Sequence, residues 1–223
     1  MKINVIYEDN HLLVVEKPVN VPVSEDESKD PDLLNALKDY LKMKYQKPGN
    51  VYLGLLHRLD RPVGGIMVFA KTSKAASRLS DQIRRNEVHK VYRAVVYHPF
   101  EKTEGTLQDY LLKNQKTNTT TVSSGSNPQA KKAELDYRVI VQNEKMALVE
   151  IELHTGRSHQ IRVQFSSRNH PLYGDQRYNK EAHPGEQIAL WATRLTFTHP
   201  TTKEEMTFTL LPPDIYPYNQ FSE

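Results

Sequence analysis

The sequence HRLDR at residues 57–61 is the part of this chain best suited to chemistry, because it places the carboxylate of Asp60 among basic side chains. It follows an apolar, strand-like stretch at residues 51–56. Nearby positive charge favours an ionised carboxylate, and an ionised, oriented aspartate can attack an electrophilic carbon. Arginine matches the geometry of phosphate groups and therefore suggests a polyanionic substrate. A surface salt bridge at a strand end explains the same residues and is the commoner case, so other segments must decide.

A second segment, KVYRAVV at residues 90–96, places Tyr92 in a strand pattern between Lys90 and Arg93. Such a tyrosine can cover the edge of a core while its hydroxyl stays in water. It can also stack on a nucleotide base, as aromatic side chains among basic residues do. Both interpretations remain open from these residues alone.

The third segment, LHTGRSHQIR at residues 153–162, has an ambiguous period. Ser158 can cap a short helix, whose first backbone amides would suit a phosphate group. Ile161, Val163 and Phe165 also alternate as they would in a strand. The segment therefore indicates a polar turn that leads into either a short helix or a strand.

Two histidines of this segment, His154 and His159, raise the question of a metal site. Their five-residue separation does not match the one-turn spacing of a helical zinc pair, and no neighbouring Asp, Glu or Cys completes a set of ligands. We therefore expect no metal, and the two histidines are assigned to holding the turn.

The elements that position these segments are mostly short strands. One helix is predicted from Asp30-Pro31, as N-cap and first helical residue, and a second is capped by Thr72 or Ser73. A polar connection at residues 114–129 joins a pair of strands. We expect one α+β domain over residues 1–223, with a large mixed, mostly antiparallel sheet flanked by helices and loops and an active-site cleft across the sheet. Apolar patterns predict strands at residues 3–7, 12–16, 51–57, 65–71, 91–97, 147–153, 191–197 and 206–210.

Charge is unevenly distributed along this chain of 223 residues with net charge +3. Residues 71–93 hold seven basic against two acidic side chains, whereas residues 1–35 hold three basic against eight acidic ones. Such polarity favours a polyanion that approaches one face. A basic helix that merely faces solvent is at least as common, so this signal supports nucleic-acid binding without establishing it.

Composition excludes several kinds of site and indicates where in the cell the protein is expected. The chain contains no cysteine, which excludes disulfides, thiolate zinc sites and cysteine nucleophiles. The first residues enter a strand pattern directly, without the features of a signal peptide. No apolar run approaches the roughly 20 residues that span a bilayer. We expect a cytoplasmic protein with no membrane association, and a monomer.

Taken together, the three segments resemble the RluA family of RNA pseudouridine synthases. HRLD, KVYRAVV and LHTGRSHQIRVQF occur in the family's order and spacing. The early block LVVEKP at residues 13–18, followed by VPV at residues 21–23, resembles the family as well. So do the late blocks NHPLYGD at residues 169–175 and LWA at residues 190–192. The resemblance covers nearly the whole chain, and it implies the pseudouridine synthase fold and an isomerase that turns uridine in RNA into pseudouridine without metal or cofactor.

The resemblance also implies roles for single residues. Asp60 resembles the nucleophile, which attacks either the anomeric carbon of the sugar or the uracil ring. Tyr92 resembles the tyrosine that stacks on the target base and is a candidate for the final proton removal. Arg162 resembles the arginine that pairs with the catalytic aspartate, as a partly buried carboxylate requires. Arg58 resembles the residue that fills the space left by the flipped uridine, which offsets part of the cost of flipping.

We expect further contacts to RNA from basic and polar side chains near these motifs. The expected partner is a stem-loop of ribosomal or transfer RNA, with no obligate protein partner. Many family members carry a small N-terminal RNA-binding domain, and we expect the catalytic domain alone to recognise RNA here. The predicted RNA-contacting residues are His57, Lys74, Arg78, Arg84, Arg85, Lys90, Arg157, His159 and Gln160.

Two positions depart from the family pattern. Val63-Gly64-Gly65 stands where a threonine-serine-glycine turn is usual, and glycine can hold the same tight turn. Asn20 stands where glycine is usual, and asparagine tolerates the left-handed conformation best among the alternatives. Neither departure touches the four residues that have implied roles.

Two other functions were weighed against the synthase. A catalytically silent RNA-binding or folding module would keep the scaffold, yet it would not need the intact set of Asp60, Tyr92 and Arg162. A glycoside hydrolase of the two-carboxylate type needs a second acidic residue, and the three motifs contain none.

Overall fold

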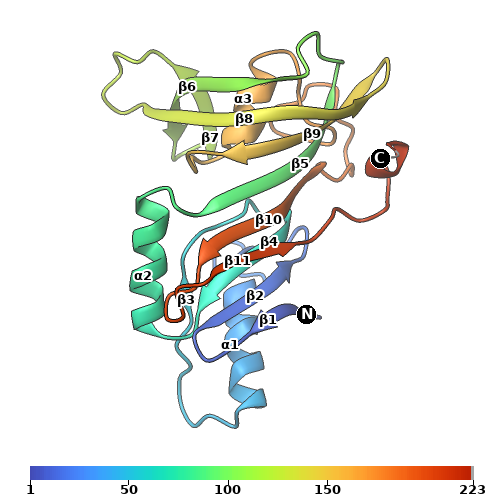
Figure 1. Cartoon of the computed structure of the whole chain (residues 1–223). Helices are drawn as coiled ribbons and strands as arrows, with labels where there is room; N and C mark the ends of the chain where they lie inside the picture. Colours follow the sequence, from blue (N-terminus) through green and yellow to red (C-terminus); the bar gives the residue numbers. More distant parts are fainter. Residues whose placement is uncertain (222–223) are drawn as a thin grey trace. The chain divides into compact units, whose positions relative to one another are not determined.

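The computed structural model describes residues 1–221, which form two compact units (Figure 1). The first unit comprises Met1–His89 with Ala192–Leu211, and the second comprises Lys90–Trp191 with the C-terminal segment from Pro212. The prediction of one catalytic domain over residues 1–223 stays a prediction. Residues 1–221 contain no helix that combines the length and the apolar character needed to cross a membrane.

The first unit is a sheet with two helices. Its strands run in the order β1, β2, β4, β10 and β11, and β3 adds to β4. The β1–β2, β2–β4, β3–β4 and β10–β11 pairings are antiparallel. The elements are β1 (Asn4–Glu8), β2 (Leu12–Lys17), α1 (Leu33–Lys44), β3 (Gly54–Leu55), β4 (Gly64–Ala70), α2 (Ser73–Arg84), β10 (Leu190–Thr198) and β11 (Glu205–Thr209).

Continuous apolar sequence explains why β2 and β4 form the centre of this unit. Every residue of β4 is buried, and five of the six residues of β2 are buried. A strand covered on both faces reads as an unbroken apolar run rather than as an alternation. Leu12, Val14, Ile66 and Val68 pack with Leu79 of α2 in one core cluster.

Both helices start at side-chain caps. The Thr72 hydroxyl accepts a hydrogen bond from the backbone amide of Ala75 and caps α2, so Thr72 is the N-cap of the two that the sequence offered. The predicted N-cap of the first helix was wrong by two residues, because Asp32 and not Asp30 accepts the amide of Asn35. The carboxylate of Asp30 instead pairs with Arg61.

Glu8 ties the edge of the first unit together. Its carboxylate accepts hydrogen bonds from Lys44, Lys71, Tyr40 and Tyr45. Burial alone would raise the pKa of Glu8, but these hydrogen bonds outweigh burial and lower the pKa to about 2. The carboxylate therefore stays ionised and joins β1 to α1 and to the residue after β4.

The second unit is an antiparallel sheet that packs against one short helix. Its strands run in the order β5, β9, β8, β6 and β7. Val163 of α3 packs on Leu111 of β6 and Ala133 of β8, which holds the helix against the sheet. The elements are β5 (His89–Tyr97), β6 (Glu104–Asn114), β7 (Thr119–Ser123), β8 (Lys131–Gln142), β9 (Met146–Leu153), α3 (Gln160–Ser166) and a 3₁₀ turn, η1 (Tyr218–Gln220).

The predicted α+β class with a mostly antiparallel sheet is confirmed. The predicted strand at residues 51–57 was wrong except at Gly54–Leu55. Beyond Leu55 a side chain replaces the backbone ladder, because Nε2 of His57 accepts the amide of Val68 at 3.1 Å. The ambiguity at residues 160–166 resolves as helix, and its N-cap is His159, in the left-handed conformation, rather than Ser158.

Candidate functional site

Asp60 lies in a tight turn of the first unit, directly before β4. The turn is closed by the amide of Val63, which donates to the carbonyl of Asp60 at 2.9 Å. Asp60 is half-buried, Leu59 beside it is buried, and Arg58 is exposed. The chain therefore anchors the turn through Leu59 and presents Arg58 to solvent.

A buried lysine holds this turn through hydrogen bonds to its backbone. Lys17, at the end of β2, has no exposed surface, and its ammonium donates to the carbonyls of Pro18, Arg61 and Val63 at 3.0, 3.0 and 2.7 Å. An ammonium has three donors and no acceptor, so these three carbonyls match it fully. Two of the three lie one and three residues after Asp60, and Lys17 therefore fixes the backbone that carries the predicted nucleophile.

Opposing influences act on the pKa of Lys17. Burial lowers the pKa of Lys17, the carboxylate of Asp60 raises it in part and the charge of Arg61 lowers it slightly, and the net pKa is about 7. Lys17 and Asp60 thus interact electrostatically, although the sequence analysis gave the lysine no role. The sequence contained one indication of this residue, the Lys-Pro pair in the LVVEKP block. That block marked the family resemblance, but it did not indicate that the side chain of Lys17 is buried.

Arg61 turns to an acidic loop of the same unit. Its guanidinium pairs with Asp30, lies 3.5 Å from Asp26 and donates to the hydroxyl of Ser28 at 3.0 Å. The sequence alone made Arg58 and Arg61 look equivalent beside Asp60. Both arginines are exposed, but the structure separates them, since the guanidinium of Arg61 binds side chains of residues 26–30, whereas Arg58 acts on Asp26 through its charge.

In the turn after HRLD, Gly65 is the residue that agrees with the family's threonine-serine-glycine pattern, and a glycine there has a steric reason. Gly65 has a φ of +124°, and a Cβ atom there would lie 2.3 Å from the carbonyl oxygen of Ala192. Only glycine fits this backbone approach of β4 to β10. Asn20, the second departure, adopts the left-handed conformation with φ 62°, as the sequence predicted.

Arg162 lies in α3 of the second unit and is buried there with an acidic partner. Its Nε and Nη2 donate to the two carboxylate oxygens of Asp175 at 2.9 and 2.7 Å. Its guanidinium carbon lies 5.2 Å from the ring centre of Tyr178. Asp175 is 1% exposed and also accepts the amides of Arg177 and Tyr178. This bidentate pair fixes the direction of Arg162.

Asp175 was missed as a functional residue by the sequence analysis. It appeared there only as the last residue of the NHPLYGD block, and nothing in that block indicated which basic residue it would meet. The backbone bends between the two residues, which are thirteen positions apart, and brings a loop carboxylate against a helix.

The polar residues before α3 bind one another. The Gln160 side chain accepts from the amide of Arg157 and the hydroxyl of Thr155, and it donates to the carbonyl of Glu134. Nδ1 of His159 lies 2.6 Å from the Tyr178 hydroxyl. His159 and Gln160 are buried, so in this structure they hold the turn, and their predicted contact with RNA stays a prediction. Arg157 is exposed.

Tyr92 and Lys90 share one face of β5, since residues two apart in a strand point to the same side. Tyr92 is 7% exposed and pairs with Ile151 of β9 in the ladder. Burial lowers the pKa of Lys90. Its ammonium lies 3.3 Å from the position that a Cβ on Gly156 would take. The strand thus brings together one predicted base-stacking residue and one predicted RNA contact.

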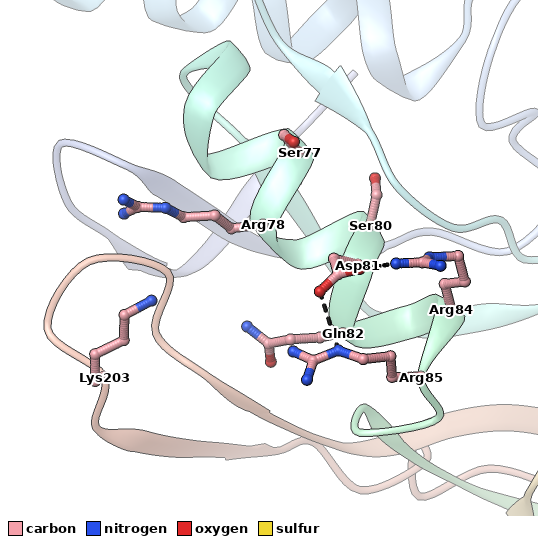
Figure 2. A pocket seen from close by; sticks show the side chains of 8 residues that line it. All are labelled: Ser77, Arg78, Ser80, Asp81, Gln82, Arg84, Arg85 and Lys203. Carbon is pink, nitrogen blue, oxygen red and sulfur yellow. Dashed lines mark hydrogen bonds and ion pairs between the residues drawn. The ribbon is translucent and has the colours of Figure 1, made fainter.

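The predicted basic face of α2 is only partly available to a ligand. Lys74 is exposed on the first turn, and Arg78 follows four residues later. Arg84 and Arg85 both pair with Asp81 (Figure 2). Arg85 also lies 3.0 Å from Glu87. Two of the four predicted contacts on this helix are therefore already engaged in surface ion pairs with carboxylates.

The structure brings the site residues together in two groups. The first unit holds His57, Arg58, Asp60 and the α2 cations, and the second holds Lys90, Tyr92, Arg157, His159, Gln160 and Arg162. In residues 1–221 no group of three or more His, Cys, Asp or Glu side chains is arranged to hold a metal ion.

Comparison with known proteins shows the family. Residues 11–167 match the family model of RNA pseudouridylate synthase, a range that contains Asp60, Tyr92 and Arg162. The chain belongs to this family, as the motifs predicted.

Curated relatives agree with this assignment. The chain is 32% identical over 211 residues to an uncharacterised RNA pseudouridine synthase of Mycoplasma pneumoniae, covering 92% of this chain and 65% of that protein. It is 34% identical over 218 residues to ribosomal large subunit pseudouridine synthase D of Zymomonas mobilis, covering 92% and 68%. It is 33% identical over 209 residues to ribosomal large subunit pseudouridine synthase C of Vibrio vulnificus, covering 91% and 63%. The chain thus spans about two thirds of the length of these relatives.

Solved structures share the fold. Human RNA pseudouridylate synthase domain containing 4 has a TM-score of 0.80 at 23% identity, covering 94% of this chain and 88% of that one. Human RNA pseudouridylate synthase domain containing 1 has a TM-score of 0.74 at 22% identity, covering 97% and 86%. These similarities show the pseudouridine synthase fold.

Proposed function

We propose that this protein is an RNA pseudouridine synthase that isomerises a flipped-out uridine in structured RNA. The observation that carries the proposal is the family match over residues 11–167, within which the HRLD, KVYRAVV and LHTGRSHQIR motifs are all intact. A protein that only binds RNA would have no use for this complete set.

The proposed reaction is an isomerisation. The bond between N1 of uracil and C1′ of the sugar breaks, and a bond between C5 and C1′ forms. C5 loses its proton and N1 gains one, so the atoms balance without a co-reactant. Asp60 is the proposed nucleophile, and its attack on C1′ and its attack on the uracil ring are both compatible with its place in the turn.

The other proposed roles follow from side-chain chemistry. Tyr92 stacks on the target base and is the candidate base for the C5 proton. Arg162, held by Asp175, stabilises negative charge on the carboxylate of the nucleophile. Arg58 is exposed and can fill the space that the uridine leaves, which offsets part of the few kcal/mol that flipping costs. The exposure of Arg58 and the buried support of Arg162 favour these roles.

The proposed substrate is ribosomal or transfer RNA. Two of the relatives are named ribosomal large subunit pseudouridine synthases, so large-subunit ribosomal RNA is the first substrate to test. The proposed place of action is the cytoplasm, and the proposed state is a monomer.

The Asp60→Asn variant tests the nucleophile. It removes the charge and keeps the shape, so we expect it to bind RNA as the wild type does and to form no pseudouridine. Asp39→Asn is the matched control, because Asp39 is exposed on α1 and the same change there should leave the activity intact. Product is measured by carbodiimide mapping of ribosomal and transfer RNA pools. Normal product from Asp60→Asn would reject Asp60 as the nucleophile. Binding without product from the wild-type protein would favour the silent RNA-binding module.

A further inference from the structure

A shallow cleft of about 600 Å³ lies beside α2, where the helix faces the turn between β10 and β11 (Figure 2). Exposed hydroxyls of Ser77 and Ser80 lie along the helix and can donate hydrogen bonds. Four cationic side chains and one carboxylate complete its charged lining, a balance of +3. These charged residues are Arg78, Arg84, Arg85, Lys203 and Asp81.

The four cationic side chains of the cleft differ in the groups that they bind. Arg84 and Arg85 are paired with Asp81. Arg78 and Lys203 instead donate to one backbone carbonyl, that of Pro200, at 2.7 and 3.1 Å. Within residues 1–221 neither of these two forms an ion pair with a carboxylate. A guanidinium has five N–H donors and an ammonium has three, so both have donors left for a ligand after their bond to Pro200.

Hydrogen bonds hold α2 and the turn between β10 and β11, which carry Arg78 and Lys203. The buried side chain of Gln82 on α2 forms two hydrogen bonds with the backbone of Thr198 on β10, at 2.8 and 2.9 Å. Nδ1 of the buried His199 accepts the amides of Thr201 and Thr202, and its Nε2 lies 2.8 Å from a carboxylate oxygen of Asp9. Helix and turn are thus locked to each other, and the two cations need little ordering when a ligand binds.

We propose that this cleft binds the phosphodiester backbone of the RNA substrate, with Arg78 and Lys203 as its phosphate-binding pair and Arg84 and Arg85 as bystanders. The inference rests on the proposed function for its choice of polyanion. It goes beyond the basic helix predicted from the sequence, because Lys203 lies far outside residues 71–93 and two of the predicted contacts drop out. Phosphate contacts of this kind position a nucleic acid without reading its sequence.

The test compares two double variants that remove the same charge. Arg78→Gln with Lys203→Gln removes the proposed pair, and Arg84→Gln with Arg85→Gln is the matched control. Binding of a short fluorescein-labelled oligouridylate is titrated across salt concentrations. Each phosphate contact to a single strand contributes about 0.7 to the slope of log affinity against log salt. We expect the first variant to lose about 1.4 from that slope, and the control to lose much less.

A wild-type slope in the Arg78→Gln, Lys203→Gln protein would overturn the proposal. Equal losses in both double variants would overturn it as well, since they would show a diffuse field rather than a site. Far-ultraviolet circular dichroism verifies folding. If the double variant fails to fold, Lys203→Gln alone alters one exposed side chain and should lose about 0.7.

Pseudouridine formation by the wild type in a ribosomal RNA pool is measured in parallel. Its absence there and in a transfer RNA pool would reject the proposed function, while the salt slopes would still decide whether the cleft binds a polyanionic strand.

Discussion

The buried pair of Arg162 and Asp175 offers a sharp test of how the second unit supports its functional side chain. In Asp175→Asn the oxygen Oδ1 can still accept from Nη2 and from the backbone amides. The new amide nitrogen would face Nε of Arg162, which is itself a donor. The substitution therefore leaves the shape intact, removes one charge-assisted hydrogen bond, and takes the negative charge of Asp175 away from a buried guanidinium.

The magnitude follows from burial. The side chains of Arg162 and Asp175 are 6% and 0% exposed, so solvent can replace little of the lost interaction. Breaking a buried ion pair by removing one partner costs about 3–5 kcal/mol. In a chain of this size about 1 kcal/mol shifts the unfolding midpoint by roughly 2–4 °C, so we expect a fall of roughly 6–20 °C.

Thermal unfolding followed by circular dichroism provides the assay, and Asp136→Asn is the control. Asp136 pairs with His154 on the surface of the same unit, with side chains 48% and 41% exposed, and such pairs contribute under about 1 kcal/mol. An equal, small shift in both variants would refute the view that Asp175 is needed to bury Arg162. At a temperature where Asp175→Asn remains folded, we also expect slower pseudouridine formation with little change in RNA affinity.

Three further outcomes follow from the first unit. Glu8→Gln should lose about 3 kcal/mol of unfolding free energy at pH 7, because the pKa of Glu8 lies near 2 against an ordinary 4.5. That stabilisation is complete above about pH 4.5 and disappears as the pH falls toward 2, so urea titrations of wild type and variant should converge in acid. Gly65→Ala should lower the yield of folded protein severely, since its Cβ would lie 2.3 Å from the Ala192 carbonyl oxygen, and a soluble variant with wild-type melting would contradict this. Lys17→Met should cost several kcal/mol, at about 1–3 kcal/mol for each buried carbonyl left without a donor, and it should slow catalysis by loosening the turn of Asp60. Urea titration and product formation measure the two effects.

Much of the fold could be predicted because its signals are local. The apolar runs of β2 and β4 and the cap at Thr72 each lie within a few neighbouring residues. Errors arose where two local choices were equally good. Asp30 precedes a proline and Asp32 precedes the first leucine pair, and only the reach of the Asp32 carboxylate to the amide of Asn35 selects the cap.

The site was predicted less completely, because its supporting contacts join distant parts of the chain. The motifs made Asp60 and Arg162 candidates, which stay predictions, and they gave no indication that Lys17 meets the carbonyls of residues 61 and 63. Likewise, no pattern on α2 could indicate that Lys203 shares an acceptor with Arg78. Such partners are set by sheet register and turn geometry, which a single sequence encodes only collectively.

The two arginines beside Asp60 show how the structure divides similar residues between support and function. Arg61 binds the acidic loop at residues 26–30, while its carbonyl accepts from Lys17. It is therefore committed to the scaffold through both its side chain and its backbone. Arg58 precedes the buried Leu59 and is exposed, so it can move into a space that opens in a bound RNA. A nucleophile needs a fixed backbone for orientation, whereas a residue that replaces a flipped base needs freedom to move. In the proposed mechanism the HRLDR sequence meets both needs, because Lys17 and the acidic loop form their hydrogen bonds with its second half.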